Sequence, residues 1–105
     1  TGDLSKIGFS FLTDLLVQEN YHIDNRLHDC GLMMYNFDDQ EVFCGGSGCA
    51  CSMCVSLTKL LNMIEQGEMK RIMVVATGAL LSPVAVQQKE SIPCIAHAIV
   101  YERSE

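Results

Sequence analysis

Basic residues are scarce in this sequence. It holds 7 Lys and Arg against 13 Asp and Glu, for a net charge of −6, and Lys70-Arg71 is a pair rather than a patch. Nucleic-acid-binding domains carry clustered positive charge, so we exclude nucleic acid as a partner. Tryptophan is absent, only two prolines occur, and no run of about 18 apolar residues lacks charged or turn residues. The sequence therefore predicts no membrane-spanning helix.

The chain also lacks a methionine start. It opens with Thr1-Gly2-Asp3, and no basic-then-apolar signal segment follows. Its 105 residues limit it to one small domain with a modest core, although 49% of them are hydrophobic. We therefore expect residues 1–105 to be a piece of a longer protein.

Six cysteines raise the question of a metal or disulfide site. A plant-type iron–sulfur run has the spacing C-x4-C-x2-C, but Ser52 stands where its third cysteine would be. Cys51 and Cys54 lie inside a predicted helix, and no second pair completes a zinc site. Isolated carboxylates such as Asp29 do not make a calcium site. We expect no metal and no cofactor, and small buried thiols in a reducing compartment.

A glycine loop leads directly into an apolar helix. The loop is Gly45-Gly46-Ser47-Gly48-Cys49, and the predicted helix, residues 51–66, carries no charge before Lys59. Glycine brings backbone N–H groups close to a ligand because it lacks a Cβ atom. Gly67 is expected to end the helix. Apolar residues surround most of this helix, so we expect it to be covered on all sides, by more material than the chain itself holds.

Two shorter patterns precede the glycine loop. Residues 3–18 have the periodicity of an amphipathic helix, which Asp3 can cap. Residues 19–31 are polar and irregular, and residues 32–35 are a strand candidate.

Two further strands are predicted after the helix. Residues 71–77 are rich in β-branched side chains and are expected to form a strand that is buried on both faces and ends at Gly78. Residues 82–93 are expected to form a long loop, which returns residues 94–101 as a second strand beside the first. This order of elements predicts an α/β fold with a mixed sheet.

Several motifs follow one another along the whole chain. They are Thr1 to Leu4, His28 to Gly31, Gly45 to Ser52, Ala76 to Pro83, Gln87-Gln88, Glu90 to Pro93 and Ile95 to Ala98. Together they resemble the C-terminal part of the stage V sporulation protein AD family.

The resemblance implies a layered α/β fold of the thiolase-like type, of which residues 1–105 would be the C-terminal half. It implies a protein of spore-forming bacteria associated with uptake of dipicolinic acid into the developing spore. Its partners would be that acid, with binding of calcium left open, and the membrane proteins of the same sporulation channel. The full-length protein would be a homodimer, located in the spore and peripherally associated with the inner spore membrane.

Thiolase-like enzymes also provide a test for catalysis. In them, this half supplies a histidine or asparagine and, in thiolases, a second cysteine. The Gly-His-Pro motif falls on Gly45-Gly46-Ser47-Gly48, without histidine, and the Cys-x-Gly motif falls on Ala76-Thr77-Gly78, without cysteine. The ketoacyl synthase histidine would fall near Thr1-Gly2-Asp3, again without an imidazole. We predict no catalytic residue in this chain and a binding protein on an enzyme fold.

A dicarboxylate ligand needs positive potential, yet no basic residue occurs between Arg26 and Lys59. Backbone N–H groups at the start of the predicted helix can supply it in part. The predicted ligand-binding residues are Gly45, Gly46, Ser47, Gly48, Cys49 and Asp3. The alternative is that the glycine loop only allows tight packing of the helix start.

Other interpretations of single residues, and other functions, remain beside this prediction. His97 is interpreted as a hydrogen-bonded structural histidine, and the adjacent residues His28, Asp29 and Cys30 are not expected to converge as a catalytic trio. Two alternative functions stay open. One is a degenerate acyl-CoA thiolase or ketoacyl-synthase-like acyltransferase that uses a cysteine from the missing half. The other is a purely structural subunit of a membrane channel complex.

Overall fold

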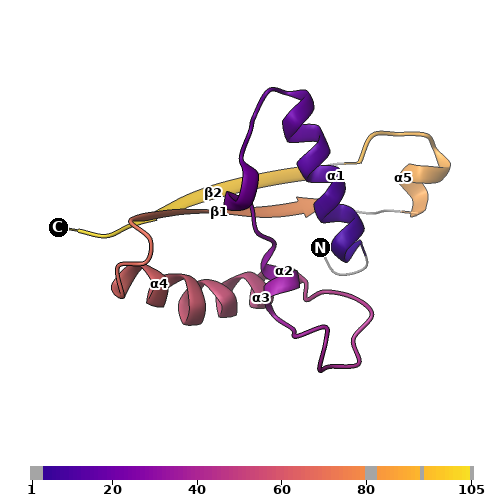
Figure 1. The fold of residues 1–105 in the computed structure, drawn as a ribbon. Coiled ribbons are helices and arrows are strands. Elements are labelled where there is room, and N and C mark those ends of the chain that lie inside the picture. The colour runs from indigo at the N-terminus through magenta and orange to yellow at the C-terminus, as the bar shows by residue number, and fades with distance from the viewer. Residues whose placement is uncertain (1–3, 80–82, 93, 105) are drawn as a thin grey trace. The chain divides into compact units, whose positions relative to one another are not determined.

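The computed structural model describes residues 4–79, 83–92 and 94–104. The chain divides into two compact units, Thr1–Lys59 and Leu60–Glu105. The first unit is helical, and the second holds the end of a helix and a β-hairpin (Figure 1). Among the described residues the sheet has two antiparallel strands, so the α/β content is confirmed, whereas a layered thiolase-like fold with a mixed sheet stays a prediction.

Helix α1 spans Ser5–Gln18 and confirms the predicted helix. Most of its predicted apolar face, including Ile7 and Phe11, is exposed in this chain. Two residues beyond the end of α1, Asn20 has a φ of 64° in the left-handed region, and the N–H of Tyr21 donates to the carbonyl of Leu16. This is the usual way to satisfy the last carbonyls of a helix. The predicted cap Asp3 lies outside the described residues.

Residues 32–35 do not form the predicted strand. After a single 3-10 turn, η1 (Asp24–Arg26), the chain forms a short helix, α2 (Cys30–Met33). The side chain of Asp29 caps it by accepting from the N–H of Leu32 at 3.1 Å. A four-residue helix is too short to show a helical period in its sequence. The Asp29 cap, rather than the apolar pattern, therefore favours helix over strand in this segment. Helix α2 contacts both α1 and the next helix, α3.

The predicted apolar helix is present but begins earlier than expected. It consists of α3 (Gly48–Val55), a π-helical turn, η2 (Ser56–Leu60), and α4 (Leu61–Glu65), which follow one another without a break. Gly67, with a φ of 80°, ends it as predicted. The division between the two units falls inside the π-helical turn.

Only one face of this helical run is covered. Its buried apolar residues are Cys51, Val55, Leu60 and Ile64. The step from Val55 to Leu60 is five residues, and this interval contains the π-helical turn η2. Met53 and Leu57 are more than half exposed. The expectation that the helix is covered on all sides is therefore not met within these residues.

Strands β1 (Arg71–Ala79) and β2 (Cys94–Glu102) pair in antiparallel register, from Arg71 opposite Glu102 to Ala79 opposite Cys94. This confirms that the two predicted strands are adjacent. Two details of the prediction are wrong. Strand β1 continues through Gly78, which lies opposite Ile95. Nor is β1 buried on both faces, because Met73 is 63% exposed.

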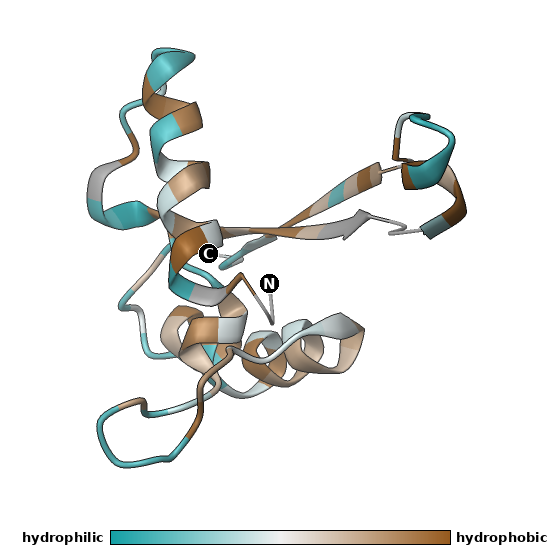
Figure 2. Ribbon diagram, turned by 90° about the vertical axis from the view of Figure 1, so that its right-hand side faces the viewer, coloured by the Kyte–Doolittle hydropathy of each residue, from teal (hydrophilic) through white to brown (hydrophobic). Residues whose placement is uncertain are grey.

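The hairpin shows its apolar character on the surface. Figure 2 shows hydrophobic residues along both strands, and the exposed ones include Val75, Ile95, Ile99 and Val100. At the open end, an exposed ion pair joins Arg71 Nη2 to Glu102 Oε1 at 2.6 Å.

The connection between the strands is not the simple loop that was predicted. It contains a short helix, α5 (Pro83–Gln87). Proline fits the first position of a helix, where its missing N–H is not needed. Two residues beyond the helix, Lys89 has a φ of 56°, and the N–H of Glu90 donates to the carbonyl of Ala85.

Candidate ligand site

The start of α3 is the centre of the predicted site. Ser47 is the N-cap residue with an extended backbone, φ −144° and ψ 169°. Its side chain makes no capping hydrogen bond with any described residue, and the first turn of α3 holds no acidic residue. Ser47, Gly48 and Cys49 are exposed. The structure therefore presents the start of a helix with its positive end open to solvent.

Gly48 is needed for its backbone conformation rather than for space. Its φ is +80°, a backbone angle that residues other than glycine adopt only at a cost in free energy. A Cβ atom added at this position would meet nothing within 4 Å. The sharp turn into α3 therefore depends on glycine, and the space around it stays open.

Gly45 and Gly46 have a different role: they allow the loop to pack closely against Gly31 of α2. The N–H of Gly46 donates to the carbonyl of Gly31 at 2.9 Å. A Cβ atom on Gly31 would lie 2.2 Å from the carbonyl oxygen of Gly46, and one on Gly45 would lie 3.0 Å from the carbonyl oxygen of Gly31. A Cβ atom on Gly46 would lie 2.8 Å from the Sγ of Cys51. We call these four residues the glycine contact.

The glycine contact supports the packing role that the sequence left open for the first half of the loop. It also removes one donor from the predicted set, because the N–H of Gly46 is already bonded within the chain. Ligand contact at Gly45 and Gly46 stays a prediction. Among the predicted residues, Ser47, Gly48 and Cys49 lie together at the helix start, and Asp3 lies outside the described residues.

The thiols near this contact are poor nucleophiles. Burial, and next the nearby Asp29 carboxylate, raise the pKa of Cys51. Burial, Cys51 and Asp29, in that order, raise the pKa of Cys30. Both thiols therefore stay protonated at neutral pH, and the protonated form neither attacks a carbonyl nor binds a metal.

The other four cysteines are not the small buried thiols that the sequence predicts. Cys44, Cys49, Cys54 and Cys94 are free and exposed. No three His, Cys, Asp or Glu side chains come close enough to hold a metal ion within the ranges that the structure describes. Asp29 serves as the cap of α2, and a cap of this kind is a signal that sequence reasoning could have used.

On the hairpin, Ala76 lies opposite His97 in the register of the two strands. Ala76 is the position at which the predicted likeness to thiolases would place a cysteine. His97 is exposed, so its interpretation as a hydrogen-bonded structural histidine has no support from burial. As to membranes, none of the described helices combines the length and the apolar character that a bilayer span requires.

Comparison with known proteins gives two findings. Residues 1–102 match the family described as stage V sporulation protein AD (SpoVAD). The chain is 49% identical over 104 residues to the stage V sporulation protein AD of Bacillus subtilis (strain 168). That match covers 99% of this chain but only 30% of the relative, so the chain spans about a third of the length of the protein it resembles.

Proposed function

Because the chain belongs to the stage V sporulation protein AD family, we propose that it supplies part of a binding site for dipicolinic acid and performs no catalytic step. In this role the protein supports uptake of the acid into the developing spore, together with membrane proteins of the same sporulation channel. It acts as a homodimer at the periphery of the inner spore membrane. The observation that carries the binding proposal is the open start of α3.

The chemistry of the ligand fits that position. Dipicolinate carries two carboxylates at neutral pH, and the N-terminus of a helix behaves like about half a positive charge. The exposed residues Ser47, Gly48 and Cys49 bring no acidic side chain to the first turn. A carboxylate placed there gains about 0.3–1 kcal/mol, and up to about 2 kcal/mol when it is partly buried.

This attraction is too small for tight binding. The chain has a net charge of −6 and no Lys or Arg between Arg26 and Lys59. We therefore expect basic residues outside these 105 residues to complete the site. The chain alone should bind dipicolinate weakly or not at all.

The sharpest test is a charge placed at the helix start without damage to the helix. Ser47→Asp keeps a good N-cap residue and adds one negative charge, whereas Ser47→Asn keeps the cap and stays neutral. Two unit charges about 4 Å apart in water interact by about 1 kcal/mol, or about fivefold in affinity. Calorimetry of the full-length protein with dipicolinate should show about fivefold weaker binding for Ser47→Asp and little change for Ser47→Asn.

Equal affinities of the two variants and the unmodified protein would remove the helix start from the site. The variant Gly46→Asp is a poor test, because any side chain at this position meets Cys51 at 2.8 Å and disturbs the glycine contact. If the unmodified full-length protein fails to bind dipicolinate at all, the purely structural role in the channel complex replaces the binding role.

The absence of catalysis needs its own measurement. The raised pKa values of Cys30 and Cys51 and the alanine at position 76 support the view that none of these three positions supplies a nucleophile. We expect no acyl-CoA turnover by the full-length protein. Turnover that depends on acyl-CoA would instead favour the degenerate acyltransferase.

A further inference from the structure

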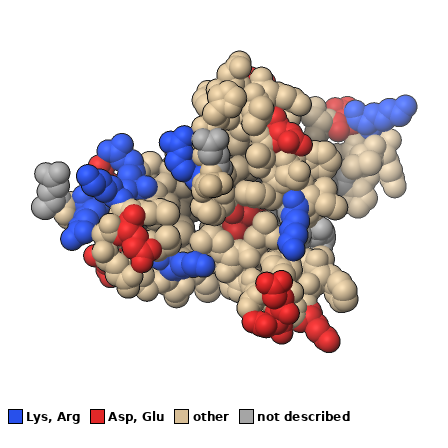
Figure 3. Space-filling model, in the orientation of Figure 1, with Lys and Arg blue, Asp and Glu red and all other residues tan. Residues whose placement is uncertain are grey.

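The loop between α2 and α3 carries an acidic, aromatic surface that the proposed function does not use. We call residues 36–43 the acidic loop. It holds Asp38, Asp39 and Glu41, and Figure 3 shows acidic side chains gathered on this part of the surface. A hollow of about 680 Å³ lies against it. The hollow is lined by Phe37, Asp38, Asp39, Gln40, Glu41, Val42 and Phe43.

Hydrogen bonds around Asn36 hold the acidic loop in shape. The backbone N–H of Asn36 donates to Oε1 of Gln40 at 2.8 Å, and the N–H of Asp38 donates to the side-chain oxygen of Asn36 at 3.2 Å. The amide of Asn36 also donates to Asp39. The loop therefore presents its outer side chains on an ordered backbone, which lowers the entropy cost of binding a partner.

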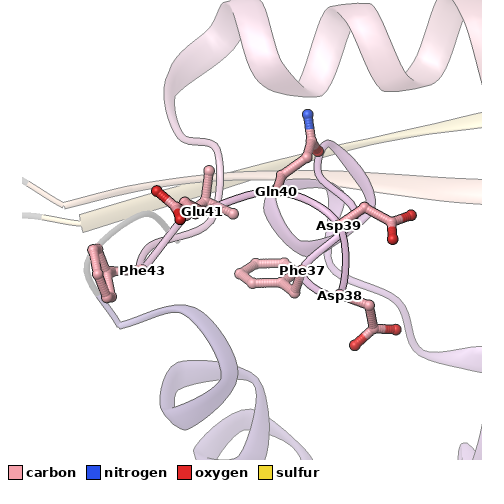
Figure 4. Close-up of a pocket in the computed structure, with 7 residues that line it drawn as sticks. Phe37, Asp38, Asp39, Gln40, Glu41 and Phe43 are labelled. Carbon is pink, nitrogen blue, oxygen red and sulfur yellow. The ribbon is translucent and has the colours of Figure 1, made fainter.

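Two phenylalanines of the acidic loop differ in what they meet. Figure 4 shows the ring of Phe37 turned in beneath the arc of the loop, with Phe43 turned away from it. The ammonium group of Lys6, from α1, lies 4.9 Å from the centre of the Phe37 ring. Phe43 is 96% exposed. One ring of the loop thus already binds a cation of this chain, and the other is presented to solvent.

We propose that the acidic loop docks a basic segment of a partner protein, in which a Lys or Arg stacks on Phe43 and its neighbours pair with the carboxylates. Charge complementarity favours this occupant. The hollow is lined by three carboxylates and two aromatic rings, and its lining holds no Lys or Arg. A cation over an aromatic face repeats the contact that Lys6 makes with Phe37. An anionic membrane surface would be repelled by the same carboxylates.

The experiment uses a fluorescein-labelled peptide of twelve alternating Arg and Leu residues, titrated into the full chain at low salt and followed by fluorescence anisotropy. A peptide of alternating Glu and Leu is the charge control. We expect Phe43→Ala to weaken binding of the basic peptide about fivefold and Glu41→Gln about twofold. The acidic peptide should not bind.

Matched variants separate docking on the acidic loop from general attraction by a negative chain. Phe11→Ala removes another exposed phenylalanine, and Glu90→Gln removes another exposed carboxylate. Neither should change the affinity. The proposal is overturned if Phe11→Ala and Phe43→Ala have equal effects, or if Glu90→Gln matches Glu41→Gln. It is also overturned if the chain binds vesicles of anionic phospholipid and Phe43→Ala abolishes that binding.

Discussion

The glycine contact in the first unit is closely packed, whereas the hairpin of β1 and β2 in the second unit leaves apolar side chains exposed. At the glycine contact, atoms of the chain approach so closely that a Cβ atom on Gly31 would lie 2.2 Å from a carbonyl oxygen. On the hairpin, the backbones pair along nine residues while apolar side chains such as Met73 and Ile99 stay more than half exposed.

The difference shows which part of the chain is complete by itself. The four residues of the glycine contact lie within 21 residues of sequence, and they contact and hydrogen-bond one another. A two-stranded hairpin is at best marginally stable in water without cover. After Arg71, strand β1 has the uncharged, β-branched composition of a strand buried on both faces. We therefore expect further segments of the longer protein to cover the hairpin.

The largest effect is expected at the glycine contact. Gly31→Ala forces the loop carbonyl away and should lower the free energy of unfolding by about 3 kcal/mol or more, at the upper end for overpacked sites. Gly48→Ala is the matched control. It meets open space but needs a φ of +80°, so about 1 kcal/mol is expected. Urea unfolding followed by circular dichroism measures both. Equal losses would mean that backbone conformation, not close approach, governs this region.

A second pair of variants compares burial directly. Val55→Ala removes two methyl groups from a side chain that is 5% exposed and should cost about 2 kcal/mol. Ile99→Thr on β2 keeps a β-branched residue at a position that is 53% exposed, and in the 105-residue chain it should change the free energy of unfolding by less than about 0.5 kcal/mol.

The same two variants in the full-length protein sharpen the comparison. If other segments cover the hairpin there, Ile99→Thr should become as costly as Val55→Ala. A full-length protein that tolerates Ile99→Thr as well as the short chain does would show that the hairpin stays uncovered.

The smallest effect concerns pH. Burial raises the pKa values of Cys30 and Cys51 above the ordinary value of 9.0. Above that pH the unfolded chain loses these protons while the folded chain retains them. The unfolded state then binds fewer protons, so the free energy of unfolding should fall as the pH rises above about 9. Well below pH 9 these thiols should contribute no pH dependence.

Unfolding measured between pH 7 and pH 10 checks this sign. Lys and Tyr also titrate in this range, so the informative quantity is the difference between the unmodified chain and Cys51→Ala. The variant should lose less stability on the alkaline side. A steeper loss in Cys51→Ala would contradict the pKa direction. Cys94→Ser, at an exposed position of β2, controls for loss of a thiol as such.

Local signals predicted the long elements well and the short ones poorly. Helix α1, the helical run that ends at Gly67 and the two strands each extend over enough residues to show a period or a composition. Helices α2 and α5 have four and five residues, too few for a period. They depend instead on the Asp29 cap and on Pro83 at the first helical position.

By itself, the sequence determined the family, the two paired strands, the apolar helix and the lack of basic groups at the candidate site, because each is expressed in neighbouring residues or in composition. Only the tertiary structure decided what each glycine does. Gly31 and Gly46 are 15 residues apart, and their contact depends on how α2 meets the loop before α3. Gly48 looks the same in the sequence, yet its surroundings are open. The role of a glycine depends on which atoms pack against its Cα atom, and those atoms come from elsewhere in the chain.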